Sequence, residues 1–345
     1  YNYLDEAVAK FSNIALKHPE YKLEDGSRIG EVSANLVLDS YNLLGDWEKV
    51  NEWARKFFAE EKLAQGKFRD DLTKVIEQSS FKLINQLEKK KEFAKAGEAY
   101  IAFVNEWPKS DLADKALMNA AIDFYNAKML DRSIDVRKML IASHPKSTYV
   151  PQTIFALAQN YEATADFMRA AEYYEAYAAG YEKDHPASPG AKKHPASGRA
   201  AKAKAKTASP EKPTKADQVW EESKAQDGLL NAGVFREGLG DFKHALKDRE
   251  KYLELWPKAK DVEVVEKSMI DLYEKMGAYG KVLKSLEEYE AKYGKDPNKL
   301  LASEGRIAAL YENQLKNPRK ARGIHDRTVS AYEKLGKKQR EALEI

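Results

Sequence analysis

The chain has 345 residues, of which 43% are hydrophobic and 33% are charged, and it contains no Cys. With 5 Trp, 19 Tyr and 12 Phe it is too apolar for a disordered chain, and no segment approaches the roughly 18 consecutive apolar residues of a membrane-spanning helix. The lack of Cys excludes disulfides, thiol nucleophiles and Cys-based metal sites. The formal net charge is +3, yet residues 183–216 alone carry nine basic and two acidic side chains.

Outside that basic stretch, apolar residues recur at spacings of three and four, as they do in residues 116–124 and 154–161. This spacing predicts amphipathic helices of about 13 to 18 residues along most of the chain. No segment alternates apolar and polar residues as a half-buried strand would, so we expect no sheet. The sequence begins at Tyr1 without a recognisable targeting segment.

A long repeat runs through these predicted helices. Its clearest copies are residues 161–174, 236–249 and 273–286, and each reads as a helix, a short turn, an aromatic residue and then a small residue three positions later. That last residue, here called the marker, recurs at intervals of 37 to 46 residues, with one interval of 75 that contains the basic stretch. In chain order the markers are Ala7, Val50, Ala96, Ser133, Ala170, Ala245, Val282 and Ala321.

Several copies carry signals for the ends of their helices. An aromatic or imidazole side chain followed by Pro predicts the end of the second helix, because Pro cannot continue a helix. These pairs are His18-Pro19, Trp107-Pro108, His144-Pro145 and Trp256-Pro257. We expect Asp111, Asp217 and Asp261 to act as N-caps of the following helices. The two longest ordinary intervals predict extended loops near residues 21–27 and 61–71.

The recurring pattern of paired helices resembles the tetratricopeptide repeat (TPR). In the copy around Ala170, the residues at the family's signature spacings are Ile154, Leu157, Ala158, Tyr161, Phe167, Ala170, Tyr174 and Tyr177. The resemblance covers roughly 300 residues, but the period is nearer 37 than 34 and most copies lack the family's Gly after the Leu. It implies an all-α fold, a TPR-like α-solenoid forming a right-handed superhelix of about seven helix pairs. The long period and aromatic-Pro endings most resemble bacterial cell-envelope TPR proteins of the outer-membrane assembly, Tol–Pal coordinator or gliding-motility type.

The chain is thus predicted to contain two solenoid parts, residues 1–182 and 217–345, separated by a basic insert at 183–216. The insert has no Ile, Leu, Val, Met, Phe, Tyr or Trp and holds 5 of the 12 Pro, so we expect a mobile loop that is dispensable for folding. It is interpreted as a solvated tether, as a contact for an anionic lipid, cell-wall polymer or protein, or as a nucleic-acid contact. Because Ala7 would lie on a second helix whose first helix is missing, we also expect further protein upstream.

No catalytic constellation stands out. The sequence has no Gly-rich phosphate loop and no His-Glu-x-x-His helix, and two of its six His occupy the pre-Pro position. A metal site would need three or four converging ligands. We therefore expect a chain that is not an enzyme and uses no cofactor or metal.

The remaining hypothesis is binding through the first helices of the pairs, which line the concave groove in TPR solenoids. By position, the groove residues would be Asn35, Asp39, Phe81, Asn85, Met118, Ile122, Phe155, Gln159, Leu230, Val234, Lys267 and Asp271. Aromatic anchors and amides suit a partner peptide. The expected partner site consists of Phe81, Asn85, Lys115, Asn119, Phe155 and Gln159. The competing interpretation is that the larger apolar members pack between repeats.

Two classes of function follow from these observations. The first is a noncatalytic scaffold for protein or peptide partners, in the periplasm or cell envelope, in an envelope or gliding-motility machine. The second is a cytoplasmic regulatory or polyanion-binding protein that acts through the basic insert. The second predicts steep salt dependence that is lost when 183–216 is deleted. A two-carboxylate clamp for chaperone tails is not expected, because its basic pair is missing from the corresponding positions.

Overall fold

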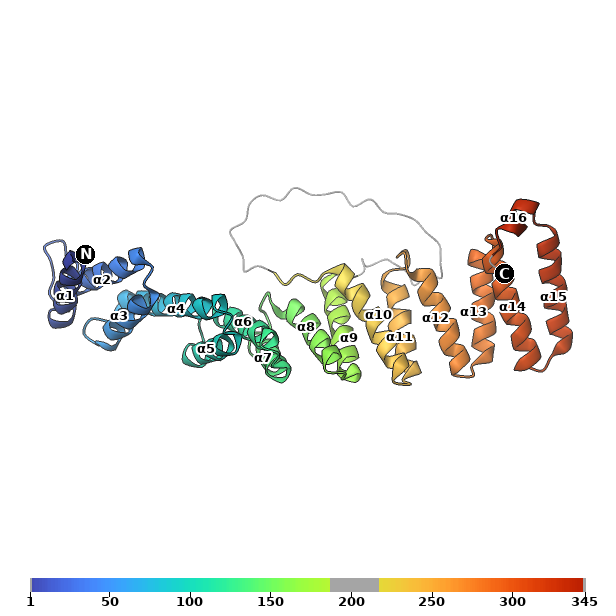
Figure 1. Ribbon diagram of the computed structural model, residues 1–345, viewed down its shortest axis with the longest axis horizontal. Coiled ribbons are helices and arrows are strands. Elements are labelled where there is room, and N and C mark those ends of the chain that lie inside the picture. Colours follow the sequence, from blue (N-terminus) through green and yellow to red (C-terminus); the bar gives the residue numbers. More distant parts are fainter. Residues whose placement is uncertain (1, 187–216, 344–345) are drawn as a thin grey trace. The chain divides into compact units, whose positions relative to one another are not determined.

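The chain folds almost entirely into α-helices. The computed structural model describes residues 2–186 and 217–343, and within these ranges the chain has sixteen helices and no strand beyond one isolated bridge between Lys22 and Arg28 (Figure 1). The helices are α1 (Asn2–Lys17), α2 (Ile29–Leu44), α3 (Trp47–Ala59), α4 (Gly66–Lys89), α5 (Phe93–Glu106), α6 (Ala113–Asn126), α7 (Leu130–Ser143), α8 (Val150–Ala163), α9 (Phe167–Asp184), α10 (Glu222–Gly238), α11 (Phe242–Leu255), α12 (Val262–Lys275), α13 (Tyr279–Tyr293), α14 (Pro297–Asn313), α15 (Pro318–Glu333) and α16 (Lys337–Glu341). The predicted all-α fold class is confirmed.

Helices that follow one another in the sequence pack against one another, from α1 to α7 and from α9 to α15. Helices α8 and α9 meet through the rings of Phe155 and Tyr174, whose centroids lie 5.3 Å apart. This gives seven consecutive pairs, α2/α3 to α14/α15, as the marker intervals predict. Every marker from Val50 onward is buried and lies on the second helix of its pair. The small marker lets the two helices of a pair approach closely. Because every pair needs this close approach, a small residue recurs at this position of the sequence.

The turn inside each pair has a constant conformation. The fifth residue before the marker has a positive φ in all seven pairs, and it is a Gly in three of them. The left-handed conformation ends the first helix and reverses the chain within a few residues, so the second helix begins at a fixed distance from the first. The seven residues are Gly45, Lys91, Lys128, Ala165, Gly240, Gly277 and Lys316.

The aromatic-Pro pairs end helices as predicted. Trp107, His144 and Trp256 are C-caps of α5, α7 and α11, with φ between −125° and −129°. His185, which precedes Pro186, ends α9 in the same way. Helix α9 therefore extends to Asp184, two residues into the predicted insert. Residues 187–216 of that insert lie outside the described residues, as does the expectation of a mobile loop.

Other local predictions are only partly right. Asp111 and Asp217 are not N-caps, and Asp261 occupies the N-cap position of α12 without a side-chain hydrogen bond. The side-chain caps lie instead mostly on the second helices, four residues before the marker, where Asp46, Asp166, Asp241 and Asn317 accept from the backbone.

The loop predicted near residues 61–71 is also shorter than expected. Helix α4 already begins at Gly66 and continues for 24 residues, so the helix absorbs most of the longer interval. The loop predicted near residues 21–27 is present between α1 and α2.

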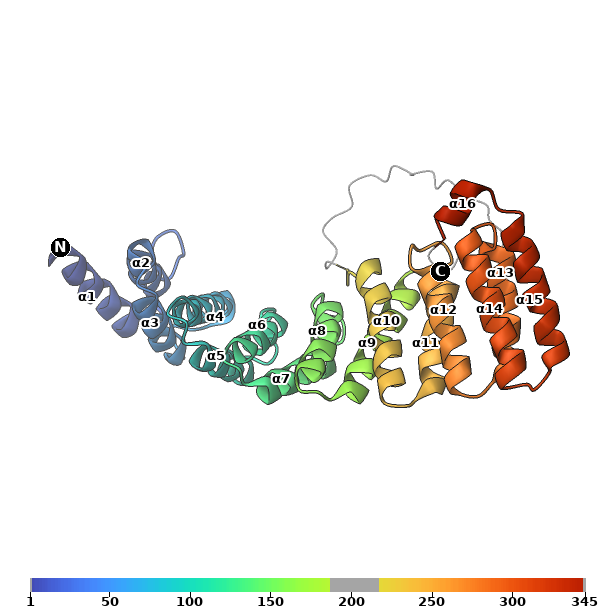
Figure 2. The same ribbon diagram turned by 45° about the vertical axis from the view of Figure 1, so that its right-hand side comes forward.

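The chain divides into two compact units. Unit 1 comprises Tyr1–Thr153 and Ala216–Gln218, and unit 2 comprises Ile154–Lys215 and Val219–Ile345. The core of unit 1 includes Ala34, Val37, Phe57, Leu72 and Ile76. In unit 2, Figures 1 and 2 both show α10 to α15 side by side in chain order. The cores between these helices include Tyr177, Leu229, Tyr252 and Val265 in one cluster and Ile270, Leu286, Tyr289, Ile307 and Leu310 in another.

Candidate functional site

The predicted anchor Phe81 lies in the core of unit 1. It is 8% exposed, and its ring meets those of Tyr100 and Phe103 edge to face at 5.2 and 4.9 Å between centroids. These two rings belong to α5, the second helix of the same pair. Lys115, from the same predicted site, is exposed on α6.

The two predicted amides of unit 1 bond to the same hydroxyl group. Tyr100 accepts a hydrogen bond from Asn119 at 3.0 Å, and its hydroxyl lies 3.1 Å from the Asn85 amide oxygen and 3.2 Å from a carboxylate oxygen of Glu88. Asp123 is buried behind this group. Burial, and then the charge of Glu88, raise the pKa of Asp123 to about 7. The amides are therefore already used to satisfy a buried polar cluster.

In unit 2, Phe155 is half-buried and lies edge-on to Tyr174 and Tyr177, with both pairs of centroids 5.3 Å apart. Gln159 is exposed one turn further along α8. Both tyrosines belong to α9, so these contacts of Phe155 lie within its own helix pair. Partner binding by the six predicted residues stays a prediction, and an open apolar surface of unit 2 lies elsewhere.

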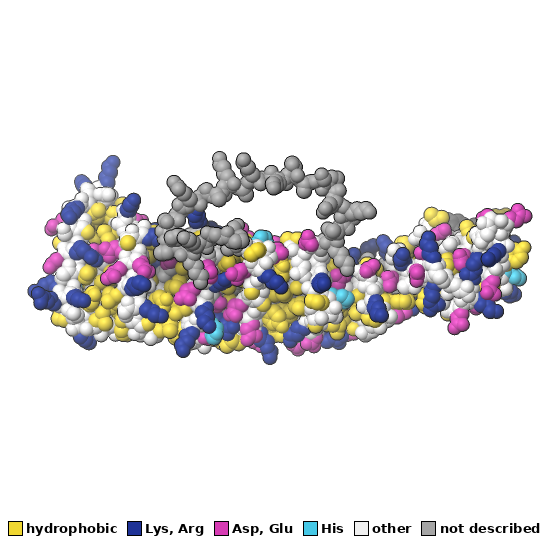
Figure 3. All heavy atoms as spheres, turned by 180° about the vertical axis from the view of Figure 1, so that it is seen from behind, with side chains coloured by type: hydrophobic (Ala, Val, Ile, Leu, Met, Phe, Trp, Pro, Cys, Tyr) yellow, Lys and Arg dark blue, Asp and Glu magenta, His cyan; other side chains and the backbone are white. Residues whose placement is uncertain are grey.

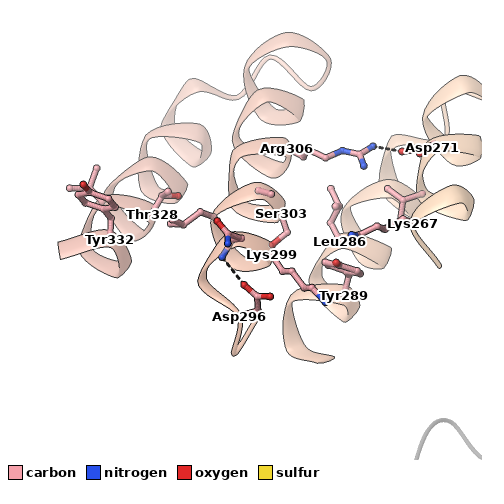
Figure 4. A pocket seen from close by; sticks show the side chains of 15 residues that line it. Lys267, Asp271, Leu286, Tyr289, Asp296, Lys299, Ser303, Arg306, Thr328 and Tyr332 are labelled. Atoms are coloured by element: carbon pink, nitrogen blue, oxygen red, sulfur yellow. Dashed lines mark hydrogen bonds and ion pairs between the residues drawn. The ribbon is translucent and has the colours of Figure 1, made fainter. Parts of the chain in front are cut away.

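That surface is a groove of about 940 Å³ along helix α14. Figure 4 shows α12 and α13 on one side of it and α15 on the other. We call it the C-terminal groove, and its lining consists of Lys267, Ile270, Asp271, Leu286, Tyr289, Asp296, Asn298, Lys299, Leu301, Ala302, Ser303, Arg306, Thr328, Val329 and Tyr332.

Small side chains on α14 give the groove its depth. Ala302 and Ser303 face the space between α12 and α15, while Ile270 and Leu286 form an apolar floor. Helix α14 is held in place at its start, where Pro297 follows the N-cap Asp296, whose carboxylate accepts from the backbone of Asn298 at 3.0 Å. The volume is near the upper end of the range of about 300 to 1,000 Å³ for ligand sites, and the groove is open along its length.

The charged side chains at the rim of the groove are held in ion pairs. Glu263 accepts from Lys299 at 2.6 Å, from the Tyr289 hydroxyl at 2.8 Å, and from Lys267 at 3.0 Å. The bonds from Lys299 and Tyr289, followed by that from Lys267, lower the pKa of Glu263 to about 2. Further along α12 and α14, Arg306 bridges Asp271 at 2.9 Å and Glu274 at 2.7 Å. These pairs hold the side chains of the rim in place.

The sequence predicts part of this groove. Lys267 and Asp271 are among the groove positions expected from the repeat, but those positions include no residue of α14 or α15. The signal that could have identified them is the pair of small residues Ala302 and Ser303 on a first helix, beside Val329 and Tyr332 on the last complete helix pair.

The described residues include no group of three or more His, Cys, Asp or Glu side chains able to hold a metal ion. None of the helices in the described ranges is long and apolar enough to cross a membrane.

No family model and no curated protein matches the sequence. Similar solved structures include a tetratricopeptide repeat protein from Parabacteroides merdae, with 11% identity, a TM-score of 0.33, and coverage of 90% of this chain and 96% of that chain. The C-terminal part of a TPR repeat-containing protein from Cytophaga hutchinsonii is 15% identical, with a TM-score of 0.34, and covers 94% of this chain and 95% of its own. Apo RapI is 11% identical, with a TM-score of 0.37 and coverages of 95% and 87%. Similarities this distant carry no argument about binding.

Proposed function

We propose that this chain is a noncatalytic scaffold that holds protein partners, and that the C-terminal groove is its main binding surface. The observation that carries the proposal is the groove itself, in which apolar side chains lie open along α14 and the rim charges are fixed by ion pairs. An open groove between helices accepts a peptide segment, because apolar side chains can enter it while its polar rim stays hydrated.

The test is capture of partners from the native host by two Arg variants of α14, followed by mass spectrometry. Ala302→Arg places a long charged side chain in the groove. Ala309→Arg places the same side chain on the same helix, exposed but outside the groove lining. We expect Ala302→Arg to lose a partner that the unmodified chain and Ala309→Arg retain. Equal capture by all three proteins would show that the groove is not the binding surface.

We further propose that the scaffold works in a bacterial envelope or motility machine. Support comes from the sequence pattern, in which long-period repeats end in aromatic-Pro pairs. Fractionation of the native host with an antibody against the chain tests this compartment. Detection only in the cytoplasm would favour the alternative, a regulatory or polyanion-binding protein acting through residues 183–216.

A further inference from the structure

The last complete helix pair presents a different surface from the pairs before it. In α9, the first, fourth, seventh and eighth residues after the marker are Ala171, Tyr174, Tyr177 and Ala178, and all are buried. In α15 the corresponding residues are Arg322, His325, Thr328 and Val329, and Ala321 is the only buried residue of that helix. Three of these four residues of α15 are exposed, and Thr328 is partly buried.

This face of α15 joins the C-terminal groove. Val329 is 55% exposed and Tyr332 is 39% exposed, and both line the groove together with Thr328. Leu301 of α14 contributes another apolar side chain to the lining of the groove. A segment lying in the groove would cover Val329 and Tyr332 and remove their apolar area from water, which favours binding.

The helices beside this apolar strip are strongly basic. Residues 318–343 contain eight Lys or Arg and three Asp or Glu. Only Arg327 and Lys337 lie within ion-pair distance of a carboxylate of the described residues. None of the other six lines the groove itself, and Lys320 lies over the ring of Tyr311, outside the groove lining. The remaining five, on α15, on α16 and in the turn between them, are called the basic rim: Arg319, Arg322, Lys334, Lys338 and Arg340. Figure 3 shows dark-blue Lys and Arg groups beside yellow apolar groups at this end of unit 2.

The apolar strip and the basic side chains beside it together indicate which kind of molecule binds in the groove. A second copy that used the same face would bring two basic rims together, which costs free energy. A polyanion such as a nucleic acid would satisfy the rim but leave the apolar strip and the groove floor unfilled. Acidic side chains on an amphipathic segment satisfy both surfaces. We propose that the C-terminal groove binds an amphipathic segment of a partner protein whose apolar side chains contact Leu301, Val329 and Tyr332 and whose acidic side chains face the basic rim.

This inference rests on the proposed scaffold function and specifies the chemistry of its partner. Two fluorescein-labelled peptides of about 18 residues, long enough for about five helical turns, test it by fluorescence anisotropy with the full chain. Both have Leu at helical spacing. One carries Glu and the other carries Lys at the same polar positions. We expect the Glu peptide to bind at least about tenfold more tightly, and its affinity to fall as salt is added.

Two double variants separate the basic rim from total charge. Lys334→Glu with Lys338→Glu reverses two charges of the rim, and Lys243→Glu with Lys247→Glu reverses two exposed charges on α11. We expect the first to weaken the Glu peptide about tenfold and the second to leave its affinity within about twofold. Val329→Ser with Tyr332→Ser should also weaken it. Since all six side chains are at the surface, circular dichroism should be unchanged.

Three results would overturn the inference. The first is equal binding of the Glu and Lys peptides. The second is self-association in light scattering that is lost with Val329→Ser and Tyr332→Ser, which would make a second copy the occupant. The third is binding of anionic vesicles or heparin at the rim that Ala302→Arg does not affect. If a host partner is lost with Ala302→Arg but retained by the rim variants, the acidic chemistry is wrong while the scaffold function stands.

Discussion

A buried polar side chain at one position of the second helix has a carboxylate partner on the first helix in several pairs, but it lacks that partner in the pair α6/α7. In three of the seven pairs, the fourth residue after the marker bonds to a Glu twelve positions earlier, on the first helix of the pair. Tyr100 pairs with Glu88, Tyr174 with Glu162, and Arg249 with Glu237. These pairs satisfy a polar group that would otherwise be buried without a partner, which is costly.

In the pair α6/α7, the corresponding residues are Arg137 and Tyr125. Arg137 is 5% exposed, and two of its guanidinium nitrogens, Nε and Nη1, have no hydrogen-bond partner among the described residues. Burial lowers the pKa of Arg137 to about 10, so the guanidinium remains charged at neutral pH. The missing carboxylate is therefore a local defect in unit 1.

Replacing Tyr125 by Glu should repair this defect. The new carboxylate would lie where those three pairs have theirs and would accept a charged hydrogen bond from Arg137, which should stabilise unit 1 by about 1.5 to 3 kcal/mol. Thermal or urea denaturation measures the change. Tyr125→Gln, which has a similar shape and no charge, is the matched control and should give a smaller gain. No difference between Glu and Gln would show that Arg137 is satisfied in another way.

A second residue-scale prediction concerns the pH dependence of unit 1. Burial and Glu88 raise the pKa of Asp123 from 3.8 to about 7, so folding favours its protonated form. The contribution of protonated Asp123 to the free energy of unfolding is fully present below about pH 4. It is lost as the pH rises through the pKa of Asp123 in the folded chain, which is about 7. Asp123→Asn is neutral at every pH and should gain stability relative to the unmodified chain between pH 5 and 8.

The measurement is the denaturation midpoint at several pH values for the unmodified chain and for two variants. Met118→Leu is the control, because it changes a buried side chain of the same helix without changing a titrating group. We expect its curve to run parallel to that of the unmodified chain. If the denaturation midpoint of Asp123→Asn also changed with pH in parallel with that of the unmodified chain, Asp123 would not titrate between pH 5 and 8.

At the scale of elements, the turns between paired helices store strain that substitution can release. Ala165 has φ of 59°, a conformation that costs a residue with a side chain about 1 to 2 kcal/mol and costs Gly almost nothing. Ala165→Gly should therefore stabilise the α8/α9 pair by about 1 kcal/mol. Ala156→Gly, in the middle of α8, should have the opposite effect, because Gly destabilises helix interiors by a similar amount. Chemical denaturation measures the free energy of unfolding, which should rise in Ala165→Gly and fall in Ala156→Gly.

Phe155 tests how helix α8 uses its aromatic side chain. Its edge-on contacts with Tyr174 and Tyr177 place it between the two helices of its own pair, so Phe155→Ala should cost about 3 kcal/mol of unfolding free energy. Gln159→Ala removes an exposed neighbour on the same helix and should leave stability nearly unchanged. If Phe155→Ala instead kept its stability and lost a partner, the partner site expected from the sequence would be the correct one.

The helix pairs were predictable because each pair needs a small or buried residue at the marker position, and this position recurs at similar intervals along the sequence. The binding surface was harder to predict. The groove face and the inter-repeat face of a first helix share the same three-and-four spacing, so periodicity could not decide whether Phe81 faces a partner or the rings of α5. The prediction of caps was partly right. Asp261 occupies the N-cap position of α12 without a side-chain hydrogen bond, whereas Asp111 is not an N-cap, and side-chain capping occurs mostly four residues before the marker, as at Asp46 and Asp166.

For the whole molecule, the contact pattern predicts that perturbations stay local. From α1 to α7 and from α9 to α15, each helix packs against its neighbours in the sequence, and a repeat array of this kind gains its stability from individual repeats and the interfaces between them. The C-terminal groove depends on α12 to α15 alone. Its shape should therefore not depend on the core of unit 1.

Phe57→Ala and Leu286→Ala test this locality by hydrogen exchange. Phe57 is fully buried in unit 1, and its loss should cost about 3 to 5 kcal/mol and speed exchange in α2 to α4. Exchange in α12 to α15 and binding at the groove should stay unchanged. Leu286→Ala, which removes part of the groove floor, should give the reverse pattern. Faster exchange throughout both units in either variant would show that the chain unfolds as one cooperative block rather than repeat by repeat.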